Sequence, residues 1–219
     1  MTNLKSENLH TVFDVGANIG EWTLQASKIF SKATVYSFEP IPFTFNLLST
    51  NTAPFGQIRK FNIALSNENS QVSMNFYESN SIFSSMFQSS LVKDEFQSVE
   101  VNCVKGDDFC KKFNIELIDF LKIDTEGSEF QILLGFQEMI KNGRIRFIQF
   151  EYGVFSLETK YLLKDFFSFF KSYGYCVGKL YPDFIDFTDY NYRKENFMVA
   201  NYVAILSNER VLTKLNSNR

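Results

Sequence analysis

A glycine-bearing loop at residues 14–20 has the residue types and spacing of a ligand-binding turn. It reads DVGANIG, follows the apolar run TVF and leads directly into the helix-forming segment EWTLQASKIF. Gly16 and Gly20 let a ligand approach the backbone, and the free N–H groups that begin the helix can receive a carboxylate or phosphate. Asp14 and Asn18 add polar side chains. We predict that this loop holds a nucleotide-like ligand, with a ligand-free tight turn as the alternative.

An acidic residue, Glu39, ends the next apolar run, 19 residues after Gly20. A carboxylate at this place can accept hydrogen bonds from both ribose hydroxyls of an adenosine. The loop lacks the GxGxxG spacing of a dinucleotide fingerprint, because three residues separate Gly16 from Gly20. Glu39 therefore indicates adenosine and leaves the reaction open. A surface glutamate without a ligand is the alternative.

A third acidic group lies in LKIDTEGSE, residues 121–129. Asp124, Glu126 and Glu129 crowd the end of an apolar run that we expect to form a strand beside the first one. Carboxylates at the carboxyl ends of parallel strands lie in the crevice where ligands bind. Their negative field suits a cationic sulfonium or a methionine ammonium better than a pyrophosphate. Glu129 fits the start of the next helix, where it complements the helix dipole.

Apolar runs that alternate with helical segments must position these residues. This alternation predicts an α/β fold with a mostly parallel sheet and one antiparallel strand at the end. The expected strands span residues 11–15, 34–39, 58–65, 118–124, 146–153, 175–181 and 201–206. The expected helices span residues 20–30, 41–51, 107–113, 128–140 and 157–172.

Residues 66–104 interrupt this rhythm. Two runs with alternating polarity, VSMNFYE and SVEVNCV, flank the serine-rich stretch SNSIFSSMFQSS. We predict a β-rich insertion here that acts as a lid. The chain otherwise carries no linker or repeat, so residues 1–219 are expected to form a single domain.

Composition argues against several classes of protein. The net charge of −3 disfavours a nucleic-acid-binding surface. The odd number of cysteines and the absence of CxxC spacing suggest neither disulfides nor a zinc site, so no metal is expected and the thiols fit a reducing cytoplasm. No apolar stretch approaches the roughly 20 residues of a membrane span. The phenylalanine-rich segment FFSFF is expected to pack against the sheet.

Five successive blocks resemble those of the FkbM family of S-adenosylmethionine-dependent methyltransferases: DVGANIGEWTL, SFEP, FNIAL, LKIDTEGSEFQILLGF and FIQFEYG. The resemblance implies a class I methyltransferase (Rossmann-like) fold, with a seven-stranded mostly parallel sheet and helices on both faces. It also implies an enzyme of EC 2.1.1 type. The expected cofactor is S-adenosylmethionine, and the expected acceptor is a hydroxyl on a sugar, glycan or secondary metabolite.

The resemblance also implies a role for individual residues. Those implied to bind the cofactor are Asp14, Gly16, Asn18 and Gly20 near methionine and ribose, Glu39 at the ribose hydroxyls, Pro40 and Ala64 beside adenine, and Asp124 near the amino group or the reacting oxygen. An alcohol must lose its proton during methyl transfer, so a general base is needed. Asp124 is the first candidate and Glu126 the second. Acceptor choice is expected to lie in residues 154–200 and in the insertion, where Ser84 and Ser85 resemble a short element of the family.

Several alternatives stay open at this point. The glycine loop with Glu39 also fits an NAD-linked oxidoreductase, and a cofactor-binding partner subunit without turnover is a third reading. His10, the only histidine, could act as a base, although a solvated role is favoured. Asp183, Asp186 and Asp189, interleaved with aromatic residues, could bind a sugar, although a solvated loop is favoured. Acceptor identity and oligomeric state are not readable from the sequence.

Overall fold

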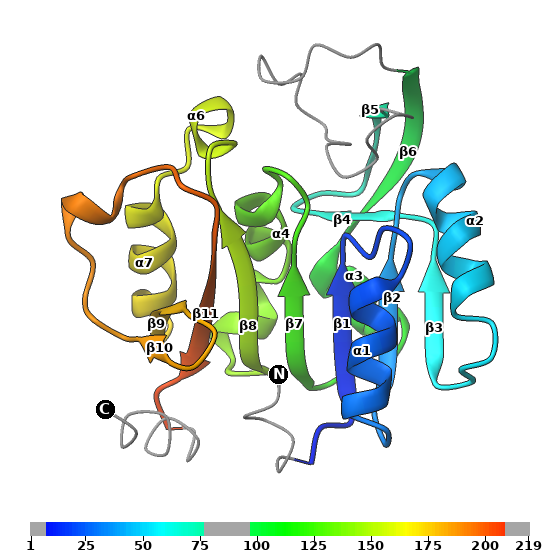
Figure 1. Cartoon of the computed structure of the whole chain (residues 1–219), viewed down its shortest axis with the longest axis horizontal. Coiled ribbons are helices and arrows are strands. Elements are labelled where there is room, and N and C mark those ends of the chain that lie inside the picture. The colour runs from blue at the N-terminus through cyan, green and yellow to red at the C-terminus, as the bar shows by residue number, and fades with distance from the viewer. Residues whose placement is uncertain (1–7, 77–96, 209–219) are drawn as a thin grey trace.

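The computed structural model describes residues 8–76 and 97–208, and its centre is an eight-stranded sheet. The strand order is β10-β9-β11-β8-β7-β1-β2-β3 (Figure 1). The bounds of these strands are β1 Thr11–Val15, β2 Thr34–Phe38, β3 Ile58–Phe61, β7 Ile118–Ile123, β8 Ile145–Tyr152, β9 Tyr175–Leu180, β10 Ile185–Asp186 and β11 Ala200–Leu206. Five adjacent strands, from β3 to β8, are parallel, whereas β11 lies antiparallel between β8 and β9. The predicted mostly parallel sheet with an antiparallel last strand is confirmed, but the sheet has eight strands rather than the expected seven, because the two-residue β10 pairs antiparallel with β9.

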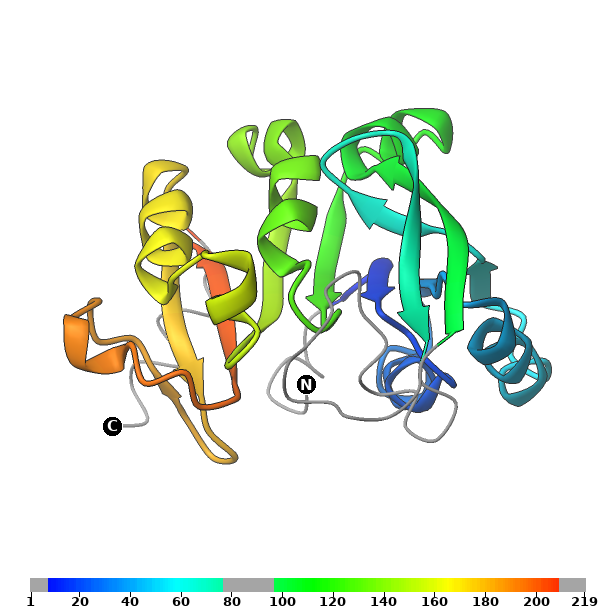
Figure 2. The ribbon, with the colours of Figure 1, turned by 90° about the horizontal axis from the view of Figure 1, so that it is seen from above.

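Helices cover both faces of this sheet. Figure 2 shows α1 and α2 on one face and α3, α4, α5 and α7 on the other. The helix bounds are α1 Glu21–Ile29, α2 Pro42–Asn51, α3 Gly106–Lys112, α4 Glu129–Gly135, α5 Gln137–Lys141, α6 Ser156–Thr159, α7 Leu163–Ser172 and the short 3-10 helix η3 Tyr192–Lys194. Pro42 begins α2 at the position where its missing N–H costs no hydrogen bond.

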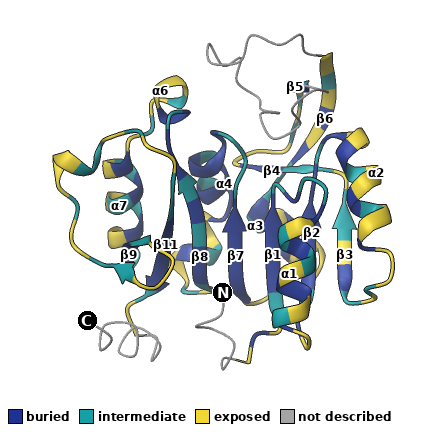
Figure 3. Ribbon diagram, viewed as in Figure 1, coloured by how far each residue is buried: buried dark blue, intermediate teal, exposed yellow. Residues whose placement is uncertain are grey.

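The central strands are buried on both faces, as a parallel sheet requires (Figure 3). Every residue of β7 is buried. Along β1, Val12 faces the cluster beneath α1, and Phe13 faces the cluster beneath α3 and α4. In the FFSFF segment of α7, Phe166 stacks on Phe150 of β8 at 4.8 Å between ring centroids. The prediction that this segment packs against the sheet is confirmed.

The segment predicted as one strand over 58–65 is in fact divided between two sheets. Its first part is β3, and its second part becomes β4 (Ala64–Ser66) in a three-stranded sheet of order β4-β6-β5. Between them, the Asn62 side chain donates hydrogen bonds to the backbone carbonyl oxygens of Glu39 and Pro40, both at 2.8 Å. These bonds hold the chain where it turns from one sheet to the other.

The β-rich character predicted for 66–104 corresponds to β5 (Ser70–Phe76) and β6 (Gln97–Lys105), which pair antiparallel. The small sheet stands over the carboxyl edge of the large one (Figure 1). The whole serine-rich stretch, residues 79–90, lies outside the described residues, and Ser84 and Ser85 are part of it. The lid function and the single-domain organisation of residues 1–219 stay predictions.

The helix predicted over 128–140 is broken at Phe136, where α4 ends and α5 begins. The Asp107 carboxylate of α3 accepts hydrogen bonds from the backbone N–H groups of Glu138 and Met139, at 3.0 and 3.1 Å. This tertiary contact satisfies the free N–H groups of a new helix start. A carboxylate 31 residues away in the chain leaves no local signal for such a break.

The helix predicted over 157–172 is also divided, because Lys160 adopts a left-handed backbone conformation with φ +61°. α7 then begins at Leu163, and the Glu195 carboxylate accepts hydrogen bonds from the backbone N–H groups of Leu163 and Lys164. Within the described ranges, 8–76 and 97–208, no helix has the length and apolar character needed to cross a membrane.

Candidate active site

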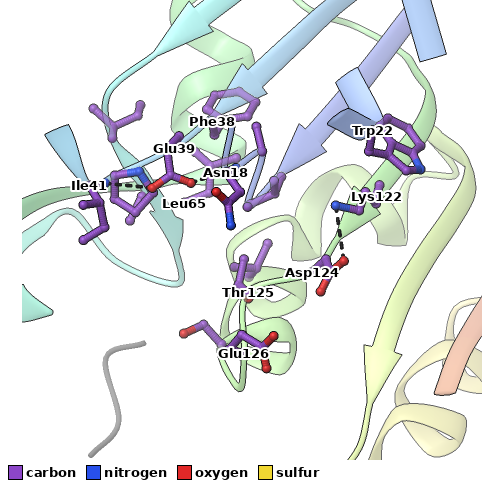
Figure 4. A pocket seen from close by; sticks show the side chains of 18 of the residues that line it. Asn18, Trp22, Phe38, Glu39, Ile41, Leu65, Lys122, Asp124, Thr125 and Glu126 are labelled. Atoms are coloured by element: carbon purple, nitrogen blue, oxygen red, sulfur yellow. Dashed lines mark hydrogen bonds and ion pairs between the residues drawn. The ribbon is translucent and has the colours of Figure 1, made fainter. Parts of the chain in front are cut away.

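A cavity of about 530 Å³ lies at the carboxyl edge of the large sheet, where β1, β2 and β7 end. The loop after β1, the end of β2, the small sheet and the loop after β7 each form part of its wall (Figure 4). Six of the residues predicted to bind a cofactor line it: Gly16, Asn18, Glu39, Pro40, Ala64 and Asp124. Glu126, the second candidate base, also lines it.

The loop after β1 is held against the end of β2. The backbone N–H groups of Gly16 and Ala17 both donate to the Phe38 carbonyl oxygen, at 3.1 and 3.0 Å. Position 16 requires a glycine, because the φ of Gly16 is +81° and an added Cβ would overlap the Asp124 backbone carbonyl. Asn18 is also left-handed, with φ +47°, and its buried Oδ1 has no hydrogen-bond partner within the described part of the chain.

Asp14 and Gly20, predicted as cofactor-binding residues, do not line the cavity. Asp14 is fully buried beneath the loop, where one oxygen accepts from the Thr23 hydroxyl at 2.6 Å and the other lies 3.2 Å from the Lys122 ammonium. Gly20 precedes α1 in a left-handed conformation, and Leu48 of α2 packs against it. Both residues support the loop, and their contact with a cofactor stays a prediction.

Lys122 is a residue of this site that sequence reasoning missed. It is buried, and its ammonium bridges Asp14 at 3.2 Å and Asp124 at 3.3 Å. It also lies 5.6 Å from the centre of the Trp22 ring, a cation–π distance. Burial acts to lower the pKa of Lys122, but the two carboxylates outweigh it and raise the pKa. A lysine inside the apolar run IDFLKID was the available signal, since such a residue needs a buried partner.

Glu39 presents a buried carboxylate at the end of β2. Its Oε2 accepts from the Asn18 backbone N–H at 2.9 Å, and its Oε1 accepts from the Ile41 N–H at 3.0 Å and the Thr44 hydroxyl at 2.8 Å. Burial raises the pKa of Glu39, while these three hydrogen bonds oppose the shift. The side chain is therefore fixed in one orientation at the cavity wall (Figure 4).

The loop after β7 carries the predicted acidic group. Glu129 is buried and begins α4; its carboxylate accepts from the backbone N–H groups of Thr125 and Gly127, at 2.8 and 3.0 Å. It closes the loop on itself, which fits the structural role expected for it. Glu126 is held in a left-handed conformation with φ +54°, next to Gly127 at φ +113°. A non-glycine residue in this region stores strain of the kind found at functional sites.

Glu151, at the end of β8, joins this loop and was not singled out from the sequence. One carboxylate oxygen from each of Asp124, Glu126 and Glu151 lies within 4.8 Å of the other two. Burial and the neighbouring carboxylates raise the pKa of Glu126 to about 8 and that of Glu151 to about 7. Three carboxylates so close could also attract a metal ion, so the absence of a metal stays a prediction. The expected place of β7 beside β1 is confirmed, whereas the position of β8 beside β7 was not predicted from the sequence.

Other sequence candidates lie away from the cavity. The His10 ring is exposed and contacts Asn8, while its backbone N–H donates to Asp119 at 2.7 Å. Asp186 accepts hydrogen bonds from Thr188 in the segment that follows β10. Neither His10 nor Asp186 lines the cavity.

Comparison with known sequences points to one family. The family model described as "Methyltransferase FkbM domain" matches residues 14–177. A "2-O-methyltransferase NoeI" of Sinorhizobium fredii is 26% identical over 156 residues, which cover 65% of this chain and 63% of the relative. A "Hexuronic acid methyltransferase AglP" of Haloferax volcanii is 25% identical over 163 residues, covering 74% and 64%. The chain thus spans somewhat less than two thirds of the length of these relatives.

A comparison with solved structures points to the same fold. A crystal structure of an FkbM methyltransferase from Methylobacillus flagellatus superposes with a TM-score of 0.56 and 16% sequence identity. The match covers 90% of this chain and 44% of the other. At this level of identity the likeness supports the fold, which is the one predicted from the sequence.

Proposed function

Because this chain belongs to the FkbM methyltransferase family, we propose that it binds S-adenosylmethionine in the cavity and transfers a methyl group to a hydroxyl oxygen. The proposed acceptor is a sugar, glycan or secondary metabolite. The single observation that carries this proposal is the fixed Glu39 carboxylate at the end of β2, in one cavity with the loop after β1. Support for a hydroxyl acceptor comes from the 2-O-methyltransferase among the relatives.

The residues present fit this cofactor. Glu39 accepts two protein hydrogen bonds at Oε1 and one at Oε2, so Oε2 retains an acceptor site that suits a ribose hydroxyl. Asn18 Oδ1 has no hydrogen-bond partner among residues 8–76 and 97–208, and a buried acceptor in that state favours a ligand donor. Asp124, 35% exposed on its side chain, can pair with the methionine ammonium. Adenine would lie against Pro40 and Ala64, which line the same cavity.

When bound, this cofactor would supply an electrophilic methyl group on a positively charged sulfur. The chain's own residues would bind and orient the cofactor and the acceptor, and one of them would accept the proton. The rigid loop around Gly16 and the fixed Glu39 would hold the donor in one pose, which is how alignment contributes to an in-line displacement. The carboxylates at the ends of β7 and β8 would add a negative field that favours a cation. A proton acceptor among them would take the hydroxyl proton.

Calorimetric titration with S-adenosylhomocysteine tests the cofactor, with NAD as the competing ligand. We expect saturable binding of S-adenosylhomocysteine that weakens at least tenfold in Glu39→Gln and is unchanged in Glu116→Gln, an exposed glutamate away from the cavity. Binding of NAD alone would favour the oxidoreductase reading. Transfer of a labelled methyl group to a panel of hydroxylated glycans and metabolites then tests turnover. Cofactor binding without transfer to any of them would favour a non-catalytic partner subunit.

A cytoplasmic setting is the compartment we propose. The three cysteines are free thiols, which is the state expected in a reducing compartment.

A further inference from the structure

We propose that Lys122 is a positioning residue for the cofactor: its ammonium holds the Asp124 carboxylate in the orientation that receives the methionine ammonium, and Asp14 offsets the positive charge that Lys122 brings to the site. This inference rests on the proposed function and describes how one end of the cofactor is recognised. Asp124 was expected near the amino group of the cofactor, whereas Lys122 was not singled out from the sequence.

The parallel register of β1 and β7 brings the three charged groups together. Asp14 of β1 pairs with Lys122 of β7, so the two residues lie at the same level of the sheet. Asp124 follows Lys122 by two residues, the spacing that puts two side chains of an extended chain on one face. The Lys122 ammonium lies between the two carboxylates, 3.2 Å from Asp14 Oδ1 and 3.3 Å from Asp124 Oδ2.

Burial gives the three side chains different access to a ligand. The side chain of Asp14 is 0% exposed, that of Lys122 7% and that of Asp124 35%. Asp124 is therefore the member of the group that a ligand can reach most readily. Figure 4 shows one Asp124 oxygen joined to Lys122 and the other pointing away from it. The ion pair thus fixes the carboxylate through one oxygen and leaves the other to accept from a ligand.

Several contacts keep Lys122 charged and in place. Burial acts to lower the pKa of Lys122, but the charges of Asp14 and Asp124 outweigh it and raise the pKa. The centre of the Trp22 ring lies 5.6 Å from the ammonium. Asp14 is fixed in turn, because its second oxygen accepts from the Thr23 hydroxyl at 2.6 Å. A buried cation held on these sides restricts the carboxylate that it binds.

A lysine beside a site for a cation would by itself weaken binding, because two ammonium groups repel each other. Asp14 removes this difficulty, since its fully buried carboxylate is a second partner of Lys122. Two carboxylates and one ammonium leave one negative charge in total, and Asp124 presents it to the cavity. The group can therefore attract the methionine ammonium and still hold Asp124 in one orientation.

Calorimetric titration with three ligands tests the positioning role. The ligands are S-adenosylhomocysteine, its deaminated analogue with hydrogen in place of the amino group, and methylthioadenosine, which lacks the amino-acid part. In the double variant Lys122→Met with Asp14→Asn, we expect the affinity for S-adenosylhomocysteine to fall at least about tenfold. The affinities for the other two ligands should change less than threefold. Lys28→Met, the same substitution at an exposed lysine, should leave all three affinities unchanged.

The direction of the change separates orientation from charge. The double variant removes a cation that lines the cavity together with an anion that is fully buried. The field at the methionine end becomes no less negative, so charge alone would strengthen the binding of S-adenosylhomocysteine or leave it unchanged. A selective loss of affinity must then come from the lost orientation of Asp124. Unchanged or tighter binding of S-adenosylhomocysteine would overturn the proposal, and so would an equal loss for all three ligands.

Asp124→Asn provides a second arm at a partly exposed position, where folding is not at risk. The amide keeps the shape but not the charge, so S-adenosylhomocysteine should bind at least about tenfold more weakly and the deaminated analogue should not. Adding the double substitution at Lys122 and Asp14 should then cost less than a further threefold, because residues that act through one contact are not additive. Full additivity would overturn the proposal, since Lys122 would then act independently of Asp124.

The failure of this inference is distinguishable from the failure of the proposed function. A selective loss of affinity in a protein that transfers no methyl group would refute the methyl transfer and support the role of Lys122. Methyl transfer together with ligand affinities that do not depend on Lys122 would support the function and overturn that role. Absence of S-adenosylhomocysteine binding in the unaltered protein would overturn both.

Discussion

Gly16→Ala should destabilise the protein and disorganise the cavity through one backbone contact. Gly16 has φ +81°, and an added Cβ would overlap the Asp124 carbonyl oxygen and come 2.9 Å from its carbonyl carbon. A side chain in this left-handed region costs about 1–2 kcal/mol. Forcing an atom into packed surroundings costs about 1–3 kcal/mol more. The backbone carbonyl cannot rotate away as a side chain could, so we expect a total of about 2–5 kcal/mol.

A matched variant separates the two contributions. Gly174 has φ +78°, but an added Cβ would meet nothing within 4 Å. Gly174→Ala should therefore show only the backbone cost of about 1–2 kcal/mol. Urea unfolding measures both, and an unchanged m-value would show that the same amount of surface is exposed on unfolding. Because stabilities of about 5–15 kcal/mol are usual, both variants should still fold.

Ligand binding should separate the variants further. The overlap at Gly16 displaces Asp124 from the cavity wall, so affinity for S-adenosylhomocysteine should fall at least tenfold in Gly16→Ala and stay unchanged in Gly174→Ala. Equal losses of stability in the two variants, or full ligand affinity in Gly16→Ala, would refute the reasoning that this close approach shapes the site.

Three further predictions concern the charges and the single tryptophan of the site. Lys122→Met should cost about 3–5 kcal/mol in urea unfolding, because it leaves Asp14 buried without its counter-ion, and Asp14→Asn in the same chain should recover part of the loss. Trp22 is the only tryptophan and lines the cavity, so intrinsic fluorescence should change saturably with S-adenosylhomocysteine; a flat titration despite calorimetric binding would contradict this. The free energy of unfolding should fall as pH rises from about 4.5 to about 8 and then level off, because folded Glu126 keeps a proton that the unfolded chain has lost. Urea midpoints measured across this pH range should fall less steeply in Glu126→Gln. An equal slope in the variant and the unaltered protein would contradict this prediction.

The strand ends could be predicted from the sequence, because the hydrophobicity of each run and the backbone conformation of the residue after it are local properties. Runs such as TVF and IDFLKID are apolar throughout, which is typical of strands covered on both faces, and they end where charged and glycine residues begin. Gly16 at a left-handed turn is likewise a local requirement. The loop, Glu39 and the acidic segment after β7 were therefore located from the sequence, and the resemblance to the FkbM family followed from the same blocks.

Boundaries that depend on distant partners were predicted less well. Asn62 divides an apparent single strand because it reaches the carbonyl groups at the end of β2. Asp107 creates a helix start, and Glu195 caps α7, from elsewhere in the chain. Periodicity records none of these contacts, since each joins segments that are far apart in sequence.

The amino-acid sequence by itself determined the fold class, the family and the set of polar residues at the strand ends, because hydrophobic periodicity and glycine geometry are local. Only the tertiary structure decided what each carboxylate does. The parallel register places Asp14 and Asp124 on either side of Lys122 and brings Glu151 beside Glu126. Burial and counter-ions, rather than residue type, set the charge and proton affinity of a carboxyl group, and both depend on which strands become neighbours.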